Sequence, residues 1–128
     1  MSDTGLLCAL LNVRSVQALR EAPTAGAIWE TFVFAQLRDR ERRTNRRGSL
    51  FFWRDRTREV DFVVDAAGRI ELFEAKWSEV PEASDAVNLD FVRGVIGKPR
   101  IVSSAIVGRT PNSYPLSDGS RATPATEL

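Results

Sequence analysis

The chain has 128 residues, enough for one domain with its own core, and 43% of them are hydrophobic. Its 18 basic and 17 acidic residues leave a net charge of +1, so total charge does not favour nucleic acid over other partners. The chain has no histidine and one cysteine, Cys8, which excludes Ser-His-Asp and Cys-His catalysis, histidine metal sites, cysteine-based zinc sites and disulfides within the chain. Any chemistry must come from carboxylates, lysine, arginine, hydroxyls and a bound ion.

The sequence has no feature of a secreted or membrane protein. No apolar run approaches the roughly 20 residues of a membrane span. The N-terminus lacks a basic segment followed by an apolar stretch and a cleavage site. We therefore expect a cytoplasmic protein that does not bind a membrane.

Two helical regions are expected before the first strand. Residues 1–25 are expected to form an N-terminal helical segment, because helix-capping residue types precede a run of leucines. Residues 26–40 are predicted to form the main helix. Glu30 falls on the apolar side of this helix, where an unpaired carboxylate is costly. Two interpretations remain: Glu30 reaches solvent or Arg38 at the edge of the apolar stripe, or it points into a cleft with other carboxylates.

A basic cluster follows the main helix. Its arginines are Arg42, Arg43, Arg46 and Arg47. The simpler interpretation is a solvated helix end, where arginine also suits the helix dipole. The alternative is a segment that contacts the phosphates of a nucleic acid.

The remaining chain predicts an α/β fold with a mixed central sheet flanked by helices. Residues 49–54, 59–65 and 70–76 form a three-stranded meander, with a tight turn at Ala67-Gly68. A helix to about residue 96 and an apolar strand over 100–108, of the type buried on both faces, follow as a crossover to a parallel strand. The single domain thus has an N-terminal segment (1–25), a core (26–108) and a loop-rich tail (109–128), in which residues 121–123 form a short edge strand.

The meander brings an acid and an amine together with a second acid. Along residues 70–76, Glu74 and Lys76 lie on the same face, because side chains alternate along a strand. A turn at residues 67–68 places Asp61 at the same end of the hairpin. Close carboxylates repel one another and take up protons or a cation, and oxygen ligands suit Mg²⁺ or Mn²⁺. This pattern is typical of a metal-dependent phosphodiesterase, in which a lysine neutralises charge on the phosphate.

The order and spacing of Glu30, Asp61, Glu74 and Lys76 resemble the PD-(D/E)xK nuclease superfamily, which has the restriction-endonuclease-like fold. The resemblance implies that Glu30, Asp61 and Glu74 bind Mg²⁺ or Mn²⁺ and are catalytic together with Lys76. It further implies that Lys76 positions the attacking water and that DNA is the substrate. The arginines of the basic cluster would hold the DNA backbone.

A narrower resemblance covers nearly the whole chain. The segments Ser2-Asp-Thr-Gly-Leu-Leu, Gly26-Ala-Ile-Trp-Glu-Thr-Phe-Val, Glu59-Val-Asp-Phe-Val-Val and Phe73-Glu-Ala-Lys-Trp are similar to a C-terminal domain of bacterial and archaeal AAA-type ATPases. That domain has no assigned function and is similar to the nuclease fold. The sequence has no Gly-x-x-x-x-Gly-Lys-Ser/Thr phosphate loop, so we expect no ATP binding by this chain.

Other interpretations remain open. The domain could be an inactive module that binds nucleic acid or docks to an ATPase or another protein. It could also form a homodimer through the aromatic segment at residues 51–53 and the apolar strand at residues 101–107, which would extend the sheet across two copies. Asp61 and Glu74 could instead form ion pairs with Lys76 or with the arginines at positions 54, 56 and 58, and Lys76 could be a surface lysine.

Overall fold

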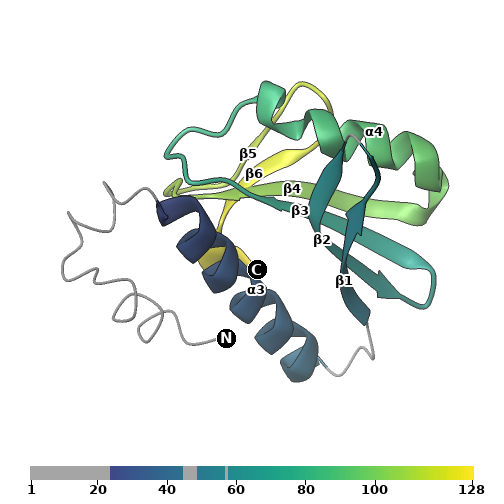
Figure 1. Ribbon diagram of the computed structural model, residues 1–128, viewed down its shortest axis with the longest axis horizontal. Helices are drawn as coiled ribbons and strands as arrows, with labels where there is room; N and C mark the ends of the chain where they lie inside the picture. Colours follow the sequence, from purple (N-terminus) through teal and green to yellow (C-terminus); the bar gives the residue numbers. More distant parts are fainter. Residues whose placement is uncertain (1–23, 45–48, 57) are drawn as a thin grey trace.

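A six-stranded mixed sheet lies at the centre of the fold in the computed structural model, which describes residues 24–44, 49–56 and 58–128 (Figure 1). The elements are α3 (Ala25–Thr44), β1 (Ser49–Arg54), β2 (Glu59–Ala66), β3 (Arg69–Ala75), η1 (Ala83–Ala86), α4 (Val87–Ile96), η2 (Lys98–Arg100), β4 (Ile101–Gly108), β5 (Tyr114–Pro115), β6 (Arg121–Pro124) and η3 (Ala125–Glu127). The segment predicted before residue 24 lies outside the described residues. Within those residues, no helix combines the length and the apolar character that a membrane span needs.

The predicted meander is confirmed, and its second turn is set by backbone geometry. β1 pairs with β2 and β2 with β3, both antiparallel. Ala67 and Gly68 both have positive φ, 54° and 83°, as the two-residue hairpin turn that matches strand twist requires. Asp65 Oδ1 accepts a hydrogen bond from the Gly68 N–H at 2.9 Å. The turn therefore fixes the register of the hairpin that carries Asp61 and Glu74.

The predicted crossover is confirmed as well, since β4 runs parallel to β3 after η1 and α4. The strand expected at the edge is an interior strand instead. β6 lies between β4 and β5 and is parallel to β4, because residues 109–120 return the chain to the middle of β4, where Arg121 pairs with Ala105. Ala122 of β6 is fully buried.

The two helices cover opposite faces of the sheet (Figure 1). Val33 and Leu37 of α3 pack on one face, and Leu89 and Val92 of α4 pack on the other. Each of these side chains is fully buried, and burial of one such side chain contributes about 1.5–3 kcal/mol. The expectation that residues 100–108 are buried throughout holds for residues 104–108, whereas residues 102 and 103 are exposed.

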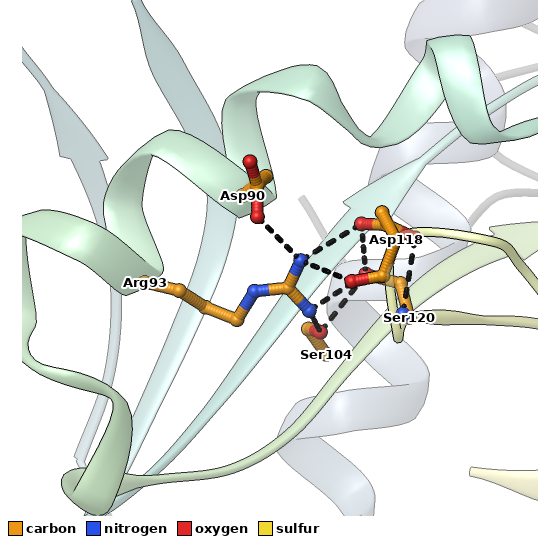
Figure 2. A network of polar contacts seen from close by, with 5 residues as sticks. All are labelled: Asp90, Arg93, Ser104, Asp118 and Ser120. Carbon is orange, nitrogen blue, oxygen red and sulfur yellow. Dashed lines mark hydrogen bonds and ion pairs between the residues drawn. The ribbon is translucent and has the colours of Figure 1, made fainter.

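A buried arginine ties the segment before β6 to α4 (Figure 2). Arg93 is 9% exposed and donates hydrogen bonds to the hydroxyls of Ser104 and Ser120 at 2.7 and 3.2 Å. Its Nη2 also lies 2.9 Å from Asp118 Oδ2 and 3.0 Å from Asp90 Oδ1. The network joins α4, β4 and residues 118–120, so it stabilises the C-terminal third of the sheet.

We expect Arg93→Met to destabilise the fold by about 3–5 kcal/mol, because it leaves the Asp118 carboxylate and two buried hydroxyls without their charged partner. Urea unfolding followed by circular dichroism would measure the loss. Arg100→Met, at an exposed arginine, is the matched control and should change stability little. Equal stabilities of the two variants would contradict a structural role for the network.

Gly108, at the end of β4, has no room for a side chain. A Cβ atom there would lie 2.5 Å from Pro81 Cγ and 2.9 Å from the Ser78 backbone oxygen. We expect Gly108→Ala to cost about 1–3 kcal/mol. Gly94→Ala in α4, where no heavy atom lies within 4 Å, should instead stabilise by about 0.5–1 kcal/mol. Thermal melts of both variants would test the prediction, and a Gly108→Ala melt at or above that of the unmodified chain would contradict it.

Candidate active site

A β-bulge positions the first carboxylate of the site. In the β1–β2 ladder, Phe52 alone lies opposite two residues of β2, Asp61 and Phe62. A bulge bends its strand and redirects side chains, and bulges are over-represented next to active sites. Asp61 Oδ2 here accepts a hydrogen bond from the backbone N–H of Ala75 at 2.8 Å. The Asp61 carboxylate thus reaches across to β3, at the end of that strand.

Asp61 and Glu74 form a coupled pair of carboxyl groups. Burial, the Asp61 charge and a hydrogen bond to Asp61 raise the pKa of Glu74 to about 9. Burial also raises the pKa of Asp61, while the hydrogen bonds from the Ala75 N–H and from Glu74 counteract part of that rise. The pair therefore holds one shared proton near neutral pH. The Glu74 Oε2 atom is buried, and no residue of the described part of the chain provides a hydrogen-bond partner for it.

Glu30 lies at the rim of this site and not in the core. Its side chain is exposed on α3, as the first sequence interpretation expected, and it also lines the cleft with Asp61 that the second one expected. Burial of part of the carboxyl, then the charges of Asp61 and Glu59, raise the pKa of Glu30. Glu30, Glu59 and Asp61 line one open cleft of about 570 Å³. The predicted proximity of Glu30 to Asp61 is thus observed, at the cleft surface.

Sequence reasoning overlooked Glu59. Its charge raises the pKa of Glu30, Asp61 and Glu74. Its Oε2 also lies 2.9 Å from Arg54 Nη2. The signal was present in the sequence, because residues two apart on a strand point to the same side and Glu59 stands two before Asp61.

Lys76 has an acidic partner other than Glu74. Its Nζ lies 3.5 Å from Asp85 Oδ1, and its side chain is 52% exposed. An exposed ion pair of this kind contributes only about 0–1 kcal/mol. The pair is therefore weak enough to break when a more negative group enters the site.

The basic cluster predicted to hold DNA is remote from the carboxylates. Arg42 and Arg43 are exposed at the C-terminal end of α3, and Arg43 Nε lies 3.1 Å from Asp39 Oδ2. At about 1.5 Å per residue, Arg42 is about 18 Å from Glu30 along the helix axis. The other two arginines of the cluster, at positions 46 and 47, lie outside the described residues. The structure thus does not bring Arg42 and Arg43 together with the acids.

Of the predicted metal ligands, Asp61 and Glu74 are the two whose carboxyl groups fit a divalent ion. In the described part of the chain, no group of three or more acidic, histidine or cysteine side chains is arranged to hold a metal ion. The predicted triad of Glu30, Asp61 and Glu74 is therefore not assembled as such. Mg²⁺, however, is commonly bound through one or two carboxylates, with waters and substrate phosphates completing its coordination. Asp61 and Glu74, with a spare buried oxygen, fit that smaller donor set.

Comparisons with known proteins point to one family. Residues 25–128 match a family model described as "Domain of unknown function (DUF4143)". The uncharacterized proteins Rv2008c of Mycobacterium tuberculosis and Mb2031c of Mycobacterium bovis are each 33% identical to the chain over 127 residues. The match covers 98% of this chain but 27% of each relative. No solved structure gives a significant match.

The raised pKa of Glu74 predicts how stability depends on pH when no divalent ion is present. A folded-state pKa of about 9, against an ordinary 4.5, contributes stability that is complete below about pH 4.5 and is lost as pH rises toward 9. Glu74→Gln keeps a neutral side chain at every pH, so its melting temperature should fall less than that of the unmodified chain over this range. Thermal melts in EDTA from pH 5 to 9 would measure the difference. Glu79→Gln, at an exposed glutamate, is the control, and parallel profiles for all three proteins would contradict the assignment.

Proposed function

This chain belongs to the DUF4143 family, and we propose that it is a metal-dependent nuclease-like domain that hydrolyses phosphodiester bonds in DNA. The observation that supports the proposal most is the Asp61–Glu74 pair, two carboxyl groups on neighbouring strands that compete for one proton. The order of a helix, a three-stranded meander, a helix and a parallel strand agrees with the restriction-endonuclease-like fold that the sequence resembles. A DNA substrate is consistent with the cytoplasmic location that we expected from the sequence.

The proposed roles follow from the contacts of each side chain. Asp61 and Glu74 would hold Mg²⁺ or Mn²⁺, and Glu74 would give up its proton as the ion binds, because ligands must be deprotonated. A bound ion would polarise a phosphoryl oxygen and lower the pKa of its water. Glu30, at the rim, would accept a hydrogen bond from water held there. Lys76 would leave Asp85 and place its ammonium beside the phosphate, where charge develops during hydrolysis.

We expect the purified chain to cleave plasmid or single-stranded DNA with Mg²⁺ or Mn²⁺ and not in EDTA. Asp61→Asn should reduce the rate by at least about 100-fold, because the neutral amide is a poorer ligand and no longer competes for the Glu74 proton. Lys76→Ala should also reduce the rate, and Lys98→Ala, at an exposed lysine away from the pair, should not. Gel assays would measure cleavage, and circular dichroism would confirm that each variant is folded. Cleavage that persists in Asp61→Asn would rule out this site as its source.

A second candidate is an inactive module of the same fold that binds nucleic acid or docks to an ATPase. The Lys76–Asp85 pair favours it, because the predicted catalytic amine is engaged elsewhere. The relatives favour it too, since this chain spans 27% of their length and they have room for further domains. Metal-independent, salt-sensitive DNA binding without cleavage would support this candidate, and loss of binding in Arg42→Ala would identify the surface.

A further inference from the structure

Two neighbouring clefts lie beside β1. Aromatic and acidic side chains line the first, and arginines predominate in the second. We propose that together they bind single-stranded nucleic acid, with a base stacked on the exposed Phe52 of β1 and phosphates held by the arginines around the β1–β2 turn. The inference rests on the proposed function for the choice of nucleic acid as ligand. It adds the strandedness of the substrate and the residues that recognise it.

The first cleft combines aromatic rings with the acids of the site. Phe34, Phe51 and Phe52 line it together with Glu30 and Asp61. Phe52 is 68% exposed and Phe51 is 46% exposed, although both are large apolar side chains. Phe52 also lies directly opposite the bulge that contains Asp61. A planar group stacked on Phe52 would therefore lie next to Asp61.

The second cleft is basic and adjoins the first. It has a volume of about 450 Å³ and is lined by Arg54, Arg56, Arg58 and Asn88, with Asp55 and Glu59. Arg54 and Glu59 line both clefts, so the two are continuous at the end of β1. The Arg58 guanidinium lies over the Phe91 ring, 4.3 Å from its centroid, which holds the cation along the wall. Guanidinium groups have five donors and bind phosphate in a bidentate manner, which suits this cleft to a phosphodiester backbone.

The aromatic cleft favours a single strand over a duplex. In a duplex the bases stack on one another, so their faces are not available to a protein side chain, whereas an unpaired base can stack on an aromatic ring. Proteins that bind single strands combine such rings with a positive groove that follows the backbone. Here Phe52 supplies the exposed ring, and the second cleft supplies the groove. Glu59 lies where the two clefts meet, and Asp61 lines the aromatic cleft beside it.

Anisotropy titrations in EDTA would test this inference separately from catalysis. The probe is a fluorescent oligothymidine of about 15 nucleotides, the upper range of one binding site. We expect it to bind at least about 10-fold more tightly than a duplex of the same length or an abasic strand. Phe52→Ala should weaken binding about 10-fold, which is the effect of losing one stacked base, and Phe52→Trp should retain it. Val102→Ala, at an exposed valine of β4, is the matched control.

The salt dependence of the binding affinity tests the arginines of the second cleft. Arg56→Ala should lower the slope of log affinity against log salt by about 0.7, the value for one phosphate contact to a single strand. Arg69→Ala, at an exposed arginine that begins β3, should leave the slope unchanged. An unchanged slope in Arg56→Ala would remove the basic cleft from the proposal.

The outcomes separate this inference from the proposed function. Equal affinity for single strand, duplex and abasic strand overturns the inference, even if Mg²⁺-dependent cleavage is found. Selective binding of single strands that Phe52→Ala abolishes supports it, even if no cleavage occurs. Light scattering would test the homodimer that the sequence left open as an alternative. A dimer that Phe52→Ala converts to a monomer would assign the exposed rings to a second copy of the chain, and would overturn the proposal.

Discussion

The hydrogen bond from the Ala75 N–H to the Asp61 carboxylate is the contact on which the site depends. It satisfies a backbone donor at the end of β3 and holds a partly buried carboxylate next to a second acid, Glu74. Two buried acids cannot both be charged at low cost, so a proton or a cation must accompany them. The geometry of one bulge thus sets the chemistry of the pair, because the bulge aims Asp61 at that N–H.

The apolar core of the fold offsets the free-energy cost of burying the two acids. Burial of the Asp61–Glu74 pair is unfavourable, and the two apolar clusters under α3 and α4 supply the opposing stabilisation. The Arg93 network shows the other way to bury charge, with every donor of its Nη atoms matched to an acceptor. The Arg93 network is satisfied by its own residues, whereas the Glu74 Oε2 has no hydrogen-bond partner among residues 24–44, 49–56 and 58–128. An incomplete polar site is the one that has capacity for a ligand.

Local patterns predicted most of the sheet and the approach of two of the candidate site residues, Asp61 and Glu74. Alternation and turn residues are local signals, so the meander, the turn at Ala67-Gly68 and the approach of Asp61 to Glu74 all followed from the sequence. Three features depend on contacts between distant segments and could not be predicted. Nothing local marks the bulge opposite Phe52, and the Lys76–Asp85 pair arises only when η1 reaches the end of β3. The interior position of β6 depends on where residues 109–120 return the chain.

The strand order also determines which strand pairs lose the most chain entropy when they form. β1, β2 and β3 pair with their sequence neighbours through short turns, so their loops close with little loss of chain entropy. β4 and β6 pair in parallel with strands reached through a helix or a long loop, and such non-local ladders slow folding. The carboxyl pair lies on the local ladder, between β2 and β3. The slow step of folding is therefore expected to complete the far side of the sheet around a hairpin that already carries both acids.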